Sequence, residues 1–557
     1  MRADGKPEGL RQSMSWLHTW SGLVLGWLLF AIFLTGTLSY ILDEIDVWMQ
    51  PGMHQSVPTA ATPQLAVDTL KELAPNASSW TISLPTPRQI ALGVSWTDPG
   101  AEAASSQVGR GRGRNARLIE LDASTGEKLT RRETAGGRFL YRFHFELYNM
   151  PRNWSRWIVG IATMFMFAAI VSGVITHKKI FVDFFTFRPG KGQRSWLDAH
   201  NVTAVLALPF HIMITFSGLL LLMLTIMPWG IQSTYGDVKT YFAESRGGHG
   251  AGGAPGGGGA RGTRPADTEP QGWVEMAPVG PMIVTAHRRW GGQDVASITV
   301  TRPGKSGSTV ELREAGGSSL LDRGSSRSMV LDADTGRVLS EKRADAPSAW
   351  AATVNALTTP HLGRFAGPAL RLLLFVSGLI GAAMVATGMV LWLVKRSPTY
   401  KAKTRHAGHR CVEILNVAAI SGLLLAVAAY FLASRFIPSG FSERAAWEIR
   451  SFFIVWVLSL AHAALRSHKA AWIEQLALAA IAFASLPLVN GWTGGAPLTS
   501  SVRNAQWSLV IFEVSMLVLS AACITTVYFL TRRSKKVPTS PKRQTAQNGA
   551  ELLEVNK

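Results

Sequence analysis

Eight apolar segments, each about 20 residues long or longer, run through this sequence of 557 residues. A helix of that length spans the hydrocarbon core of a bilayer, which is about 30 Å thick. With 47% hydrophobic residues, the chain is also too apolar for an ordinary soluble domain. We therefore predict a polytopic membrane protein with an all-α membrane part, whose spans cover residues 16–42, 155–177, 200–228, 367–394, 411–432, 447–465, 471–489 and 506–531.

The formal net charge of +20 comes largely from basic clusters that follow every second apolar segment. Lys178, Lys395, Arg466 and Arg532 each belong to one of these clusters. Cytoplasmic loops of membrane proteins are enriched in Lys and Arg, so all the clusters share one side if both chain ends are cytoplasmic. The basic residues are thus explained by topology in a bacterial inner (plasma) membrane, with lipid as the surrounding partner, and no nucleic-acid partner is predicted.

This topology leaves two long segments, residues 43–154 and 229–366, on the periplasmic side. A Gly-rich insertion, Gly247 to Gly262, interrupts the second segment and is expected to be a flexible loop. The remaining divisions are a cytoplasmic N-terminus at 1–15, basic cytoplasmic loops at 178–199 and 395–410, a four-helix membrane extension at 411–531 and a basic cytoplasmic tail at 532–557.

A nine-residue motif occurs once in each of the two periplasmic segments. The stretch from Leu121 to Leu129 reads LDASTGEKL, and the stretch from Leu331 to Leu339 reads LDADTGRVL. Asp and Gly favour a tight turn between the apolar ends of two short strands. Each copy therefore predicts a β-hairpin, and together they indicate an internal duplication.

Histidines take part in the same duplication. His18 precedes the pair Thr35-Gly36 by the same distance at which His200 precedes Ser217-Gly218. With a small difference in spacing, His144 and His361 each precede an apolar run, and these runs end in Gly173-Val174-Ile175 and Gly388-Met389-Val390. An imidazole near a membrane span is costly without a partner, so repeated histidines suggest a shared ligand.

These features together resemble the PepSY-associated transmembrane family, which includes iron-regulated membrane proteins and siderophore reductases. The resemblance extends from residue 11 to about residue 400, and its most specific stretches are Trp16 to Gly22, the two Leu-Asp-x-x-Thr-Gly hairpins and the region from His177 to His211. It implies a four-helix core that holds haem and two α+β PepSY-like periplasmic domains. The four C-terminal apolar segments depart from the shorter members of the family.

A b-type haem in a helical bundle needs two imidazoles from different helices, one on each side of the iron. His200 and His211 are eleven residues apart, which in one continuous helix places them on nearly the same face and roughly 16 Å apart. We therefore expect two haems b. The candidate ligands are His200 with His18 or His177 for the lower haem, and His211 with His361 or His144 for the upper haem.

No nicotinamide, flavin or nucleotide motif is recognisable, so electrons must come from a separate cytoplasmic reductase or from quinol. The predicted function is haem-dependent electron transfer across the inner membrane to a periplasmic ferric chelate, a ferric siderophore, in iron uptake. The sequence does not identify the catalytic residues. The alternative is a haem-free PepSY accessory protein that binds or restrains a periplasmic partner or protease, with structural histidines.

Overall fold

The computed structural model describes residues 9–86, 88, 90–99, 117–177, 184–238, 240–241, 274–316, 319–321, 326–343, 347–401 and 407–532. The Gly-rich insertion, Gly247 to Gly262, and residues 533–557 of the tail lie outside these ranges. Eight helices in the described part are long and apolar enough to cross a membrane, which confirms the number of spans that the sequence predicts.

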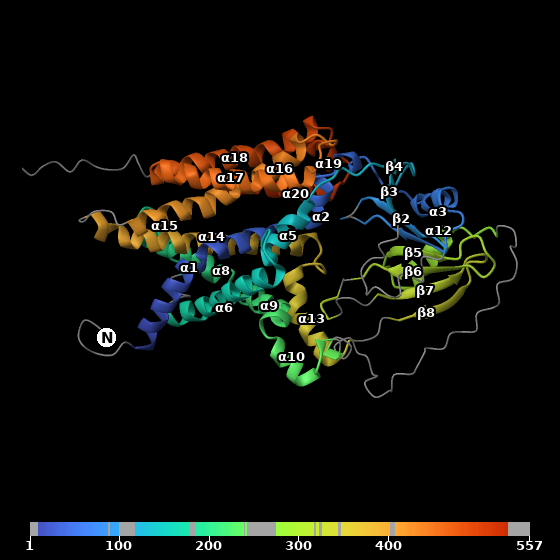
Figure 1. Cartoon of the computed structure of the whole chain (residues 1–557), viewed down its shortest axis with the longest axis horizontal. Helices are drawn as coiled ribbons and strands as arrows, with labels where there is room; N and C mark the ends of the chain where they lie inside the picture. The colour runs from blue at the N-terminus through green and yellow to red at the C-terminus, as the bar shows by residue number, and fades with distance from the viewer. Residues whose placement is uncertain are drawn as a thin grey trace, which may run out of the picture.

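The eight spanning segments comprise the following helices. They are α1 (Leu10–Ser39), α6 (Arg152–Thr176), α9 (Leu208–Ile226), α14 (Pro368–Lys401), the continuous run of α15 (Ala407–Val417), η2 (Ala418–Gly422) and α16 (Leu423–Phe436), then α17 (Arg444–Leu465), α18 (His468–Trp492) and α20 (Trp507–Arg532). Helix α1 packs against both α6 and α14, and α6 packs against α9. Figure 1 shows most of the spanning helices lying along the long axis of the molecule, with the strands gathered at one end.

Shorter helices complete the helical part. They are α2 (Leu42–Trp48), η1 (Pro51–Met53), α5 (Gly136–Glu146), α8 (Gln193–Leu206), α10 (Pro228–Tyr235), α13 (Ala349–Leu362) and α19 (Leu498–Arg503). Helix α5 packs against α1, α8 against α14, and α13 against α9. These three short helices bring additional side chains to the faces of the spanning helices, and three of the candidate histidines lie on them.

The strands form one antiparallel sheet of eight, in the order β4-β3-β2-β1-β5-β6-β7-β8. Their bounds are β1 (Ser79–Ser83), β2 (Leu92–Thr97), β3 (Arg117–Leu121), β4 (Lys128–Leu129), β5 (Val295–Thr301), β6 (Thr309–Glu314), β7 (Ser328–Asp332) and β8 (Val338–Lys342). Helices α3 (Thr62–Leu73) and α12 (Val279–Arg289) pack against it over a core that includes Trp80 and Ile298.

This sheet corrects the prediction of two separate PepSY-like domains. Each sequence repeat supplies one helix and four strands, but β1 of the first pairs with β5 of the second, with Thr81 opposite Thr299. Without this pairing, each half would expose the backbone groups of an edge strand. The two repeats therefore form a single continuous layer.

The two predicted hairpins are confirmed as β3–β4 and β7–β8. In both turns the Asp side chain, from Asp122 or Asp332, accepts a hydrogen bond from the backbone N–H of the Thr three residues later. Gly126 and Gly336 adopt φ values of +76° and +69°, a conformation that costs least for glycine.

The third predicted span is not one helix. Helix α8 ends at Leu206 and α9 begins at Leu208, while Ala207 between them has φ −112° and ψ 24°. Pro209 lies at the start of α9, where its missing N–H costs no helical hydrogen bond. Because the helix axis is interrupted, the argument that His200 and His211 share one face of a continuous helix is wrong.

Candidate functional site

A first pair of histidines lies between α1 and α8. The ring centres of His18 and His200 are 6.1 Å apart, with 63° between the ring planes. Each ring rests on a glycine of a neighbouring helix: a Cβ added to Gly173 would lie 3.1 Å from the His18 ring, and one added to Gly388 would lie 3.0 Å from the His200 ring. Both glycines therefore provide space that a larger residue would remove.

A second pair repeats this arrangement with α5 and α13. The ring centres of His144 and His361 are 6.0 Å apart. A Cβ on Gly36 of α1 would lie 2.6 Å from the His144 ring, and one on Gly218 of α9 would lie 3.4 Å from the His361 ring. The glycines that follow His18 and His200 in the sequence repeat therefore contact the rings of the second pair.

Backbone carbonyl groups hold three of the four rings. Each of these carbonyls belongs to the residue four positions before the glycine under that ring, so one turn of helix provides both contacts. The Nδ1–H groups donate to these oxygens as follows: His18 to Ala169 at 2.8 Å, His144 to Ile32 at 2.7 Å and His200 to Met384 at 2.9 Å.

The fourth ring, His361, uses a serine hydroxyl instead. Its Nδ1 lies 2.9 Å from Ser217 Oγ, and the Ser217 hydroxyl donates to the Met213 carbonyl at 2.5 Å. Because that hydroxyl proton is already used, Nδ1–H of His361 is the donor. Burial also lowers the pKa of both His144 and His361, the latter to about 3, so both rings are neutral near pH 7.

The hydrogen bonds determine which ring nitrogen is available to a metal. A carbonyl oxygen only accepts, so Nδ1 carries the proton and the lone pair of the neutral ring lies on Nε2. Histidines that ligate metals usually donate their other N–H to a carbonyl or carboxylate in this way. All four rings are thus held in the tautomer that ligates through Nε2.

The spacing within each pair fits a haem. Two imidazoles that ligate one iron from opposite sides have ring centres roughly 6 Å apart, since each metal–nitrogen distance is about 2 Å. In the described part of the chain, no three His, Cys, Asp or Glu side chains come together as a metal site. Histidines that meet in twos match a group such as haem, in which the porphyrin supplies the other four ligands.

The two remaining candidates are not members of these ring pairs. His177 caps the end of α6, and its Nε2 is 2.9 Å from the side-chain amide of Asn201. His211 is fully buried, with its ring edge-on to Phe33. A Cβ on Gly381 would lie 3.2 Å from His211 Nε2, so this ring also rests on a glycine.

A cavity of about 1080 Å³ adjoins the second pair. His144 and His361 line it together with apolar side chains from the spanning helices, including Leu29, Ile32 and Met166. Polar side chains line another part of it. Arg88, between β1 and β2, and Gly316, just after β6, also line the cavity, so it borders the part of the chain that contains the sheet with α3 and α12, called the strand unit below. The cavity therefore provides apolar space next to two available imidazole nitrogens, which is what a porphyrin requires.

Comparison with known families matches residues 15–395 to the PepSY-associated TM region. The chain belongs to the PepSY-associated TM region family. Both histidine pairs and all eight strands lie within the PepSY-associated region, while α15 to α20 lie outside it. No curated protein matches the chain closely enough to count as a relative.

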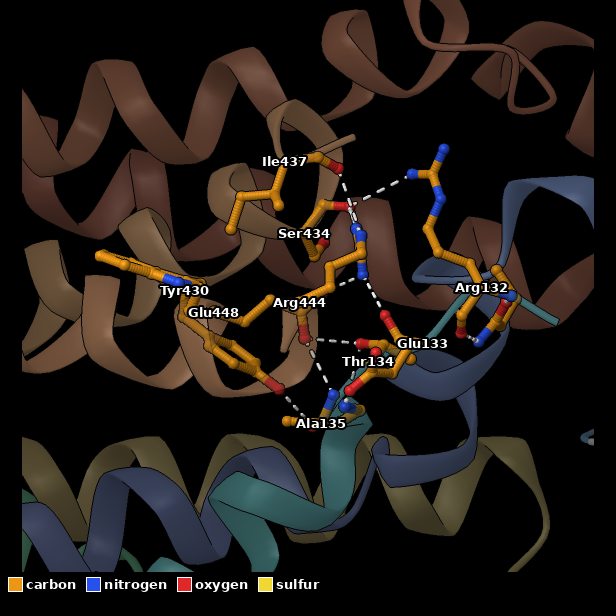
Figure 2. Close-up of polar contacts among 12 residues, drawn as sticks. Arg132, Glu133, Thr134, Ala135, Tyr430, Ser434, Ile437, Arg444 and Glu448 are labelled. Carbon is orange, nitrogen blue, oxygen red and sulfur yellow. Dashed lines mark hydrogen bonds and ion pairs between the residues drawn. The ribbon is translucent and has the colours of Figure 1, made fainter. Parts of the chain in front are cut away.

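The C-terminal helices contact the PepSY-associated region at the segment that leads into α5. Arg444 of α17 lies 2.5 Å from Glu448 and donates to the carbonyl oxygens of Glu133 and Ser434. The other oxygen of Glu448 accepts from Thr134 Oγ1 at 2.7 Å and from the backbone N–H of Ala135 at 2.9 Å. Figure 2 shows this network, in which Glu448 and Arg444 face the chain just before α5.

A third contact lies one residue further along the chain. The Tyr430 hydroxyl of α16 donates to the carbonyl of Gly136, the first residue of α5, at 2.7 Å. His144 is eight residues further along the same helix, so α16 and α17 help to determine where its ring lies. The extension therefore supports one member of the second pair.

Sequence reasoning missed two parts of this site. It did not assign the glycines to the histidines, whereas Gly36, Gly173, Gly218, Gly381 and Gly388 each lie under the ring of a ligand candidate. It also missed the arginines around α5, although Arg138, Arg142, Arg152 and Arg156 flank His144 closely in the sequence. Their density next to a candidate ligand was a usable signal.

Proposed function

We propose that the chain is an electron-transfer protein with two haems b, one between His18 and His200 and one between His144 and His361. The observation that carries this proposal is the repeated unit of a paired imidazole, a glycine beneath it and an Nδ1 hydrogen bond that leaves Nε2 available. When bound, each haem supplies a one-electron Fe(III)/Fe(II) couple.

The protein residues have separate tasks in this proposal. The four Nε2 atoms would hold the iron of each haem, the carbonyls and Ser217 orient the rings, and the glycines allow each ring to approach its neighbouring helix. Helix α1 contacts both pairs: it carries His18, and its Ile32 carbonyl accepts the hydrogen bond from His144. The helical rise separates His18 and Ile32 by about 20 Å. The two pairs therefore lie at different depths along the helical bundle.

The direction of transfer follows from the proposed topology. Both chain ends would lie in the cytoplasm of a bacterial cell and the strands in the periplasm, because the basic loops follow every second span. A cytoplasmic reductase or quinol would supply electrons, and a ferric chelate such as a siderophore would accept them. Hard oxygen ligands hold Fe(II) more weakly than Fe(III), so reduction releases the iron.

The first test is the colour of the purified protein. Protein purified in detergent from haem-replete cells is expected to contain about two haems per chain and to show the sharp α and β bands of reduced bis-histidine haem. Pyridine haemochrome assay and protein quantification give the ratio. A colourless preparation would contradict the proposal and favour a PepSY accessory protein with structural histidines.

The second test is vectorial reduction. In proteoliposomes with reductant on one face, Fe(II) is expected to form from a ferric chelate on the other face, and a trapped Fe(II) indicator measures it. Protein with both His18 and His144 replaced by leucine provides the control. If ferric chelates do not speed up haem reoxidation, iron is not the substrate. The proposal of transmembrane electron transfer would still stand.

A glycine substitution tests the second pair separately. Gly36→Ala is expected to displace His144, because the new Cβ would lie 2.6 Å from its ring, and about one haem per chain should be lost. Gly22→Ala on the same helix is the matched control, since nothing lies within 4 Å of its added Cβ. Equal haem content in both variants would contradict the assignment of His144.

A further inference from the structure

The polar part of the cavity beside His144 and His361 carries an excess of positive charge. Among the described residues that line it, six are arginines and three are carboxylates: Arg88, Arg138, Arg142, Arg152, Arg156 and Arg364, with Asp43, Asp46 and Glu146. These nine side chains are called the arginine rim below. They come from the ends of α2, α5, α6 and α13 and from the strand unit.

One carboxylate of the rim, Glu146, is shared among three of its arginines. Glu146, the last residue of α5, lies within 2.9 Å of three arginines: Arg142 at 2.8 Å, Arg152 at 2.9 Å and Arg156 at 2.7 Å. One carboxylate thus serves three guanidinium groups.

The other two carboxylates have partners of their own. Asp43 forms an ion pair with Arg88 at 2.9 Å, and Asp46 accepts a hydrogen bond from the backbone N–H of Gly137 at 2.7 Å. The six arginines still outnumber the three carboxylates of the rim. Arg138 and Arg364 are both exposed and both line the cavity.

Guanidinium groups bind carboxylates in a bidentate manner, and such charge-assisted hydrogen bonds are stronger than neutral ones. We propose, on the basis of the proposed function, that the arginine rim binds ligand carboxylates next to the His144–His361 pair. Two ligands offer this chemistry: the propionates of a haem held by that pair, and the carboxylates of an anionic ferric chelate that accepts its electron. Apolar side chains that line the same cavity, including Leu29, Ile32 and Met166, provide space for the rest of a porphyrin.

The test uses the full-length protein with Arg138→Gln and Arg364→Gln combined. Both side chains are exposed, so folding should be retained. Arg289→Gln with Arg337→Gln is the matched control, because it removes the same charge from two exposed arginines of the strand unit that do not line the cavity. The substrates are ferric citrate, which is anionic, and ferrichrome, a neutral ferric trihydroxamate.

If the rim binds the chelate, KM for ferric citrate rises about tenfold, KM for ferrichrome is unchanged and the haem spectrum is retained. If it binds the haem propionates, the haem of the second pair shifts in potential or is lost, while the ratio of the two KM values is unchanged. Both results support carboxylate binding and separate its source. No difference from the control variant in either measurement would overturn the proposal.

A binding measurement separates this proposal from the proposed function. Gallium citrate has the charge and shape of a ferric complex but is not reduced, so calorimetry measures its binding without electron transfer. If the protein proves to be haem-free but binds gallium citrate, and the double substitution weakens this binding, the rim proposal stands and the haem proposal is wrong. If the protein contains haem, and the double substitution changes neither its affinity for gallium citrate nor its haem potentials, the rim proposal alone is wrong.

Discussion

Replacing His200 by leucine is expected to remove the haem of the first pair and to leave the second pair intact. The Nδ1 of His200 is bonded to the Met384 carbonyl and its ring is paired with that of His18, so a haem held by this pair would lose one of its two imidazoles. Haem content should fall from about two to about one per chain, because a low-spin b haem needs both imidazoles. Haemochrome assay and the reduced spectrum measure this change.

Two further histidines serve as controls for this experiment. His177→Leu is expected to leave both haems in place, since the Nε2 atom of His177 contacts Asn201 rather than another imidazole. His211→Leu is expected to retain both as well, because the His211 ring faces Phe33 and is not paired with a histidine ring. Loss of the second haem in His211→Leu but not in His144→Leu would instead support the pairing of His211 with His361.

Features encoded in short stretches of sequence could be predicted. A run of about 20 apolar residues is sufficient for a membrane helix, and the described part of the chain contains eight such helices, the number expected. The Asp and Gly of each LDxxTG motif make a turn through contacts within five residues, so both hairpins were predictable. The duplicated positions of His18 and His200 likewise indicated equivalent places in the fold.

Features that depend on distant pairing could not be predicted. Nothing in β1 or β5 alone shows that they pair with each other, so the two repeats were expected to form separate domains. The interruption at Ala207 had a signal in Pro209, but a proline in the first turn of a helix and one inside a helix look alike in sequence. The prediction of one continuous helix is the reason that the sequence assigns His211 to the upper haem, with His361 or His144 as its partner.

The choice among the histidines depends on tertiary placement. His144 lies on α5, a short helix outside the apolar runs, and only the packing of α5 against α1 brings its ring to Gly36. The acceptors of the Nδ1 hydrogen bonds are backbone atoms, which leave no signature in residue identity. The glycines were visible in the repeat, yet their partners were not.

Replacing Arg444 by leucine is expected to be the most destabilising single change outside the PepSY-associated region. Arg444 and Glu448 are both fully buried, and Glu448 also holds Thr134 and Ala135. Removing one partner leaves a buried charge without its ion pair, which costs about 3–5 kcal/mol. The thermal unfolding midpoint in detergent should fall, and the second haem should be lost before the first on heating.

The order of haem loss is what distinguishes a specific role from general damage. Arg444 contacts the chain just before α5, which carries His144, whereas the first pair is held by α1, α6, α8 and α14. Arg450→Leu on the same helix is the matched control, because its ion pair with Glu443 is exposed and such pairs contribute roughly 0–1 kcal/mol. Simultaneous loss of both haems in Arg444→Leu, or an equal effect of Arg450→Leu, would show that the C-terminal helices do not position the second pair. Selective loss of the second haem would mean that a bundle outside the family region helps to hold a ligand within it.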